Sequence, residues 1–244
     1  MEKEFQGSFT QQEPLAEEAI EAAIKVMRHG RLHRYNVVEN ETSEVALFEQ
    51  DFANKFGVKF CLACASGGYA MTTALRAMGI EFGDKILTNG FTLAPVPGAI
   101  AAAGGEVVFV EVNGDLLIDL NDLERKIISS NSKVLLLSHM RGHICDMDLL
   151  MSLCGKYEVK VVEDCAHTMG AKWNKKWSGR YGILGCYSTQ TYKHLNSGEG
   201  GILITDDEKI MARAIMLSGS YMLFDRHISG PEISVFDDIK LKTP

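Results

Sequence analysis

The sequence predicts an α/β fold, with a mostly parallel, mixed central sheet that carries helices on both of its faces. Short apolar runs, such as residues 134–138 and 160–164, alternate with segments of helical periodicity. This alternation is typical of strands that are buried on both faces and joined by helices. The chain has 244 residues, of which 46% are hydrophobic and 23% charged, so it can bury the core of one large domain.

Each expected element follows from its apolar spacing and from the residues at its boundaries. Helical periodicity covers residues 14–29 and 43–56, and Ser43 is placed to cap the second helix. The expected strands occupy residues 59–65, 85–90, 106–112, 133–139, 160–164, 182–189 and 200–205. The helices expected between and after them occupy residues 67–79, 94–104, 121–128, 146–157 and 206–219. Residues 223–244 have no clear periodicity and are expected to form a loop.

Charge and composition exclude several classes of function. The net charge of −7 argues against binding to nucleic acid or to an anionic membrane surface. No segment approaches the ~18 consecutive apolar residues of a membrane span, and the first residues are polar and acidic. Neither a membrane span nor a signal peptide is therefore expected, and the chain is expected to be cytoplasmic.

The six cysteines lie in apolar surroundings and are expected to be buried, reduced thiols. Cys61 and Cys64 form a C-x-x-C pair, but no second pair follows, so a core role is favoured over a zinc or redox role. The histidines show no metal-ligand spacing that the expected elements support. No metal site is expected.

Asp164 stands at the end of a buried strand, at the edge of the sheet where ligands of such folds bind. An ionised carboxylate there needs a cationic or hydrogen-bonding partner. The protonated ring nitrogen of pyridoxal 5′-phosphate (PLP) is one such partner. Capping of the following turn is an alternative role, and Asp164 alone does not distinguish the two.

Lys193 lies between an apolar strand and a glycine-rich turn, among aromatic and hydroxyl side chains. Most lysines in such a sequence are surface residues. Partial desolvation would lower the pKa of this amine and make it a nucleophile for a carbonyl group. Ser66-Gly67-Gly68-Tyr69 joins a strand to a helix, where free N–H groups suit a phosphate, although a purely structural turn fits equally well.

The order of these residues resembles the DegT/StrS family of PLP-dependent sugar aminotransferases, within the aspartate-aminotransferase fold superfamily. That family shows E-D-x-A-[QH]-x-x-G-A, then G-x-x-G, S-x-x-x-x-K and E-G-G. The matching stretches here are residues 163–171, 182–185, 188–193 and 199–201. The resemblance extends upstream through residues 64–112 and 138–148 and covers nearly the whole chain. It implies the large domain of a type-I PLP-dependent transferase.

The resemblance assigns Lys193 as the residue that holds PLP as a Schiff base. It implies that Asp164 pairs with the ring nitrogen, and that His167 lies beside the 3-oxygen of the ring. The phosphate would be contacted by Ser188 together with the backbone around Gly68 and Tyr69. The family commonly stacks an aromatic residue on the ring; here either Leu93 packs there or Phe91 takes that role.

The implied reaction is the transfer of an amino group, typically from glutamate, onto a keto group of a nucleotide-linked sugar. It proceeds in two halves through the pyridoxamine form, and sugars of this kind serve polysaccharide biosynthesis. A dehydratase branch of the family replaces the lysine by histidine, but the motif places Lys193 there and not His194. Transamination is therefore favoured over sugar dehydration.

The resemblance makes Arg34 and Tyr35 substrate candidates, because they lie where family members place substrate-facing loop residues. Arg141 is a third candidate: it could meet an anionic substrate group, and an ordinary surface charge fits it equally well. The expected division is an N-terminal helix and substrate-loop segment at 1–40, a PLP-binding large domain at 41–222 and an irregular connection at 223–244. Family members form homodimers and continue into a smaller C-terminal domain, which is expected to be absent or truncated here. A non-catalytic or regulatory PLP-binding protein is therefore one alternative. A nucleotide-binding doubly wound domain without PLP is another.

Overall fold

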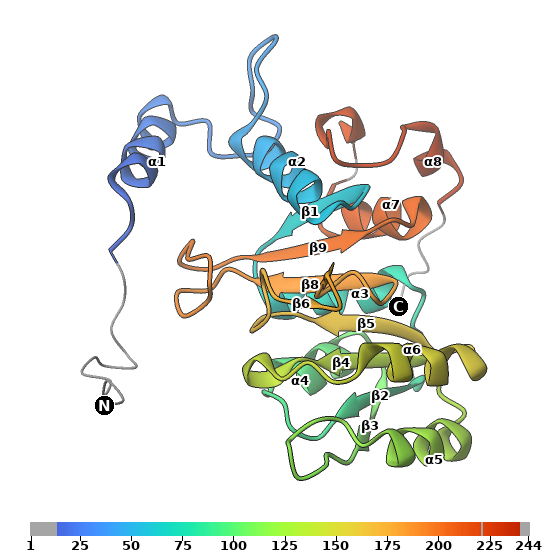
Figure 1. Ribbon diagram of the computed structural model, residues 1–244. Helices are drawn as coiled ribbons and strands as arrows, with labels where there is room; N and C mark the ends of the chain where they lie inside the picture. The colour runs from blue at the N-terminus through green and yellow to red at the C-terminus, as the bar shows by residue number, and fades with distance from the viewer. Residues whose placement is uncertain (1–13, 221, 240–244) are drawn as a thin grey trace, which may run out of the picture.

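The computed structural model describes residues 14–220 and 222–239, and their main feature is a seven-stranded sheet (Figure 1). Its strands are β1 (Phe60–Cys64), β2 (Lys85–Asn89), β3 (Glu106–Val110), β4 (Val134–Ser138), β5 (Lys160–Asp164), β8 (Leu184–Ser188) and β9 (Gly201–Thr205). The strand order is β1-β9-β8-β5-β4-β2-β3. β9 is antiparallel to both of its neighbours, and the other four pairs are parallel. The expected mostly parallel, mixed sheet is confirmed.

Helices cover both faces of the sheet. One face carries α3 (Gly67–Ala77), α4 (Pro95–Ala102) and α7 (Glu208–Leu217). The other face carries α2 (Glu44–Phe56), α5 (Leu120–Ser130) and α6 (Met147–Lys156). Successive strand residues point to opposite faces: Val162 joins the first core and Val161 the second. Both side chains are buried, which explains why the strands read as continuous apolar runs rather than as alternating ones.

Polar caps begin most of the helices where the sequence places them. The Ser43 hydroxyl accepts a hydrogen bond from the Ala46 N–H at the start of α2, which confirms the expected cap. Carboxylates of Asp119, Asp146 and Asp207 cap α5, α6 and α7 in the same way.

Some elements were not expected from the sequence. A small hairpin joins β6 (Lys172–Trp173) to β7 (Lys176–Trp177). Its two turn residues, Asn174 and Lys175, both have positive φ, as in the turns that tight hairpins favour. The region expected to be a loop after residue 222 contains the 3-10 helix η2 (Phe224–Arg226) and the one-turn helix α8 (Ser234–Asp237), while residues 240–244 lie outside the described part.

The N-terminal helix α1 (Glu17–His29) stands apart from the sheet in Figure 1 and has no buried residue. Residues 1–13 of the expected 1–40 segment lie outside the described part. No described helix is both long and apolar enough to cross a membrane. All six cysteines are free, and only Cys64 among them is not fully buried.

Candidate active site

Asp164 ends β5 at the carboxyl edge of the sheet and is 7% exposed. Its Oδ2 accepts a hydrogen bond from the Ser138 hydroxyl at 2.9 Å, and its Oδ1 accepts one from the Ala166 N–H at 3.1 Å. Asn89, at the end of β2, in turn accepts from the Ser138 N–H at 2.9 Å and donates to the Ser138 carbonyl at 3.1 Å. The ends of three neighbouring strands thus hold the carboxylate in one orientation. Each carboxylate oxygen keeps a lone pair for a further donor.

Lys193 and His167 meet beside this carboxylate. Lys193 Nζ lies 2.8 Å from His167 Nε2, and the other ring nitrogen of His167 accepts from the Arg141 N–H at 3.2 Å. Burial lowers the pKa of Lys193; Asp164 opposes this shift and the Arg141 side chain adds to it. Burial and the charge of Lys193 also lower the pKa of His167. Both groups are therefore biased towards their neutral forms, and a neutral amine is the nucleophilic form of lysine.

The loop that carries Lys193 is held by hydrogen bonds across its base. The Thr189 N–H donates to the Gly200 carbonyl at 2.9 Å, and the Ser197 N–H donates to the Thr189 carbonyl at 2.9 Å. Glycine is needed at the end of this loop because a Cβ on Gly201 would lie 2.7 Å from the Gly67 nitrogen. The E-G-G stretch therefore allows β9 to begin against the first turn of α3.

The first turn of α3 has a geometry that could hold an anion. The Tyr69 N–H donates to the Ser66 hydroxyl at 3.0 Å, so this amide already has a partner. The N–H groups of Gly67 and Gly68 stand at helix positions that have no acceptor within the helix. Ser188 lies against this turn, since a Cβ on Gly67 would lie 2.9 Å from the Ser188 Cβ. Exposed amides at a helix N-terminus beside a hydroxyl suit a phosphate group.

Phe91 and Leu93, the two residues considered for stacking on the ring, lie in the segment between β2 and α4. Phe91 packs edge-on against His143, with ring centroids 6.3 Å apart, whereas Leu93 is 45% exposed. The buried Thr92 hydroxyl between them has no hydrogen-bond partner among the described residues.

The three substrate candidates fall into different environments. Both terminal nitrogens of Arg34 donate to the buried carboxylate of Glu49, at 2.6 and 2.7 Å. The Tyr35 hydroxyl lies 2.7 Å from His227 Nε2. The polar groups of Arg34 and Tyr35 thus have partners inside the chain. Arg141 is exposed beside His167, close to Lys193.

Glu163, the neighbour of Asp164 in the E-D motif, is a residue to which the sequence analysis assigned no role. Its side chain points to the opposite face of the sheet and is fully buried. Its carboxylate accepts from the N–H groups of Gly179, Tyr181 and Gly182 at 2.7–2.9 Å and lies 3.1 Å from His139 Nε2. Burial raises the pKa of Glu163, but His139 and these amides outweigh it and hold the pKa below its usual value. Glu163 therefore anchors the loop that precedes β8.

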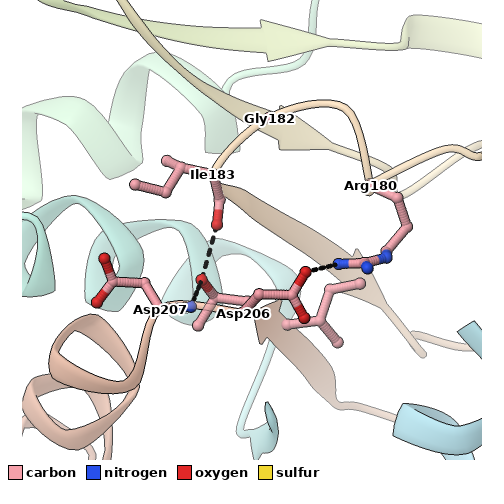
Figure 2. Close-up of a pocket in the computed structure, with 8 residues that line it drawn as sticks. Arg180, Gly182, Ile183, Asp206 and Asp207 are labelled. Carbon is pink, nitrogen blue, oxygen red and sulfur yellow. Dashed lines mark hydrogen bonds and ion pairs between the residues drawn. The ribbon is translucent and has the colours of Figure 1, made fainter. Parts of the chain in front are cut away.

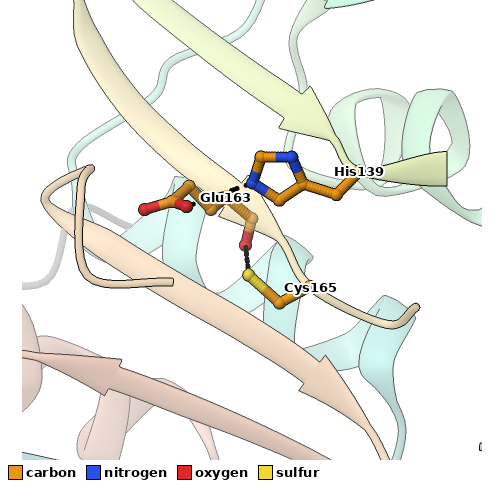
Figure 3. A group of neighbouring side chains, drawn as sticks. All are labelled: His139, Glu163 and Cys165. Atoms are coloured by element: carbon orange, nitrogen blue, oxygen red, sulfur yellow. Dashed lines mark hydrogen bonds and ion pairs between the residues drawn. The ribbon is translucent and has the colours of Figure 1, made fainter. Parts of the chain in front are cut away.

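His139, Glu163 and Cys165 bring potential metal-ligand atoms within 4.8 Å of one another (Figure 3). The carboxylate of Glu163 already accepts several hydrogen bonds, as described above. Burial raises the pKa of the Cys165 thiol well above its ordinary value, and the metal-binding form of cysteine is the thiolate. The cluster is better explained as a hydrogen-bonded part of the core.

A separate pocket lies at the opposite edge of the sheet, where β8 begins and β9 ends (Figure 2). Arg180 points into it, but its guanidinium donates to Asp206 at 2.8 Å and to the Gly57 carbonyl at 2.8 Å. Its charge is already paired. The sheet separates this pocket from Lys193, which follows the other end of β8.

Known proteins are similar to this chain in sequence and in fold. The model of the DegT/DnrJ/EryC1/StrS aminotransferase family matches residues 14–225. GDP-perosamine synthase of Escherichia coli O157:H7 is 28% identical over 190 residues, 78% of this chain and 52% of that protein. A "pleiotropic regulatory protein" of Geobacillus stearothermophilus is 30% identical over 224 residues, 90% of this chain and 58% of that protein.

Among solved structures, NtdA of Bacillus subtilis with its bound cofactor PMP matches with a TM-score of 0.72 and 25% identity. The match covers 83% of this chain and 44% of NtdA. The chain thus spans about half the length of the proteins it matches. The fold is that of the large domain of these transferases, and the family model spans most of the chain. The chain therefore belongs to the DegT/DnrJ/EryC1/StrS aminotransferase family.

Proposed function

We propose that this chain is the cofactor-binding part of a PLP-dependent aminotransferase that moves an amino group from glutamate onto a keto group of a nucleotide-linked sugar. The observation that carries the proposal is the approach of Lys193 Nζ to within 2.8 Å of His167 Nε2, beside the Asp164 carboxylate. The cofactor reported for NtdA and the activity named for GDP-perosamine synthase support the cofactor and the substrate class.

The residues present fit PLP at each of its functional groups. Asp164 would hold the ring nitrogen, and Lys193 would hold the carbonyl carbon. His167 would lie at the 3-oxygen, while Ser188 and the amides around Gly68 would hold the phosphate. Bound PLP supplies an electron sink for the carbon that loses a proton.

The chain's own residues then have distinct tasks. The Asp164 carboxylate, kept in place by Ser138, stabilises positive charge on the group that it faces. The Lys193 amine first binds the cofactor as a nucleophile and, once released, can move a proton at Nζ. Its lowered pKa suits both tasks, because each requires an unprotonated amine.

We also propose that the protein is cytoplasmic and forms a homodimer, as the family resemblance implies. Within the chain, the proposed boundaries of the PLP-binding large domain lie after residues 40 and 222. Support for a partner comes from α1, whose apolar side chains Ile20 and Met27 are 36% and 63% exposed. Among the substrate candidates Arg141 is favoured, since its exposed side chain lies beside the cofactor residues, whereas Arg34 is paired with Glu49.

A second candidate is a regulatory PLP-binding protein without turnover. It is favoured by the name of the Geobacillus relative, which this chain matches over 90% of its own length. Both candidates require the same cofactor site, so they differ only in amino transfer.

The experiment that separates them is a half-reaction. Purified protein is incubated with stoichiometric PLP and then with glutamate, and both products are measured. Formation of pyridoxamine phosphate together with an equal amount of 2-oxoglutarate supports the aminotransferase. PLP that stays bound through Lys193 without conversion supports the regulatory protein, and a protein that fails to bind PLP contradicts both.

A further inference from the structure

The turn after β4 is docked on the segment that follows β5. The His139 N–H donates to the Asp164 carbonyl at 3.1 Å, and the Arg141 N–H donates to His167 Nδ1 at 3.2 Å. Within the turn, the Gly142 N–H donates to the His139 carbonyl at 3.1 Å. The main chain of residues 139–142 therefore lies alongside residues 164–167 and contacts the imidazole ring of His167.

Arg141 adopts a left-handed backbone conformation, with φ 56° and ψ 20°. This region is disfavoured for residues that have a Cβ and persists where surrounding contacts require it. Gly142, with φ 84°, continues the same bend. The bend turns the Arg141 N–H towards His167, so an uncommon backbone conformation coincides with a contact to a cofactor-site side chain.

A backbone N–H can only donate a hydrogen bond, so His167 Nδ1 must supply a lone pair to Arg141. In a neutral imidazole the single proton then resides on Nε2. Nε2 is the nitrogen that lies 2.8 Å from Lys193 Nζ. The ring therefore presents a donor to the lysine side, and a neutral lysine amine has the lone pair to accept it.

We propose that the backbone amide of Arg141 is a positioning group that holds His167 as the neutral imidazole protonated at Nε2. Its consequence for catalysis rests on the proposed function: His167 acts there as a fixed hydrogen-bond donor and not as a proton-carrying imidazolium. The charges that surround the ring also favour its neutral form. Burial and the positive charge of Arg141 disfavour an imidazolium at His167, whereas the carboxylate of Asp164 favours one.

The tautomer can be measured in the cofactor-free protein, independently of any activity. The histidines are labelled with ¹⁵N, and the ring nitrogens are correlated with the ring protons by NMR at neutral pH; loss of one signal set in His167→Gln gives the assignment. We expect a protonated Nε2 and an unprotonated Nδ1. The opposite tautomer, or an imidazolium, overturns the proposal even if PLP binds.

The role of the amide itself is tested by replacing residue 141 with lactic acid, which exchanges the N–H for an ester oxygen. The matched control is Arg141→Ala, because alanine has the same methyl side chain as lactic acid but keeps the backbone N–H. We expect the control to retain the Nε2-protonated form and the ester variant to lose that preference. An unchanged tautomer in the ester variant shows that the amide does not position the ring.

Cofactor binding adds a second readout. Gln at position 167 offers a carbonyl to the Arg141 N–H and an NH₂ group to the lysine side, which is the pattern of the Nε2-protonated ring. We expect His167→Gln to bind PLP with the pH dependence of the wild type, and His167→Ala to bind it about tenfold more weakly. A loss in His167→Gln equal to that in His167→Ala contradicts the proposal. Absence of PLP binding in every protein, wild type included, contradicts the proposed function and leaves the NMR result to decide the tautomer.

Discussion

The orientation of Asp164 at the carboxyl edge of the sheet depends on residues of two other strands. Asp164 needs Ser138 to orient it, and Ser138 is itself held by Asn89 from another strand. The sequence identified Asp164 and Lys193 through their motif. It placed Asn89 at the end of a strand, on the edge where ligands bind, but assigned no role to Asn89 or Ser138. Their role depends on which strands are neighbours, and apolar spacing does not encode that order.

Gly67, the first residue of α3, and Gly98, the fourth residue of α4, allow a comparison of two helical glycines. A Cβ on Gly67 would lie 2.9 Å from the Ser188 Cβ, whereas a Cβ on Gly98 would meet nothing within 4 Å. We predict that Gly67→Ala lowers the free energy of unfolding by about 1 kcal/mol and weakens PLP binding about tenfold, because it moves Ser188 away from the helix end.

Gly98→Ala is the control and should raise the free energy of unfolding by about 0.5–1 kcal/mol through helix propensity alone. Denaturant unfolding and PLP titration measure both effects. Equal behaviour of the two variants would show that the approach of α3 to Ser188 has no part in the cofactor site.

At the scale of elements, sequence periodicity predicted every strand of the main sheet and all the long helices, to within a few residues. It did not predict that β9 runs antiparallel to β1 and β8. Both faces of β9 are buried, and such a strand has the same apolar character in either direction. The β6–β7 hairpin was missed because each of its strands has only two residues.

A buried polar cluster joins three elements that are distant in sequence. Arg34 pairs with Glu49 of α2, and Glu49 also accepts from the Ala63 N–H of β1 at 2.6 Å. His227, which follows η2, accepts from Arg34 at 3.2 Å and lies 2.7 Å from the Tyr35 hydroxyl. The family resemblance suggested Arg34 and Tyr35 for the substrate. The sequence could not reveal their internal partners, which lie up to 193 positions away.

This cluster predicts a pH dependence of stability. Burial, followed by the charge of Arg34, lowers the pKa of His227 from 6.5 to about 3. The unfolded chain therefore binds a proton between these values that the folded chain does not, and stability falls as the pH falls below 6.5. From pH 7 to pH 5 we expect His227 to remove about 2 kcal/mol of unfolding free energy.

Denaturant unfolding at both pH values measures this loss. His227→Gln should lack that part of the pH dependence, while His143→Gln, at an exposed histidine, should keep it. A His227→Gln variant that loses as much stability as the wild type between pH 7 and pH 5 would contradict the assignment.

On the scale of the whole molecule, the fold gathers one site from segments spread along most of the chain. The ends of β2, β4, β5 and β8 and the start of α3 meet at one edge of the sheet. The α/β pattern predicts that ligands bind at this carboxyl edge of the sheet. The family resemblance predicts which residues there hold the cofactor. The anchoring of the loop before β8 by Glu163, and the contact of Arg141 with His167, required the three-dimensional structure.

The central claim is that Lys193 is the residue that carries PLP. Borohydride reduction of the PLP-treated protein, followed by proteolysis and mass spectrometry, locates the attached cofactor. We predict the added mass on the peptide that contains Lys193, its loss in Lys193→Ala and its retention in Lys156→Ala, which changes an exposed lysine. An unlabelled Lys193 peptide, or labelling in Lys193→Ala equal to that of the wild type, would contradict the account.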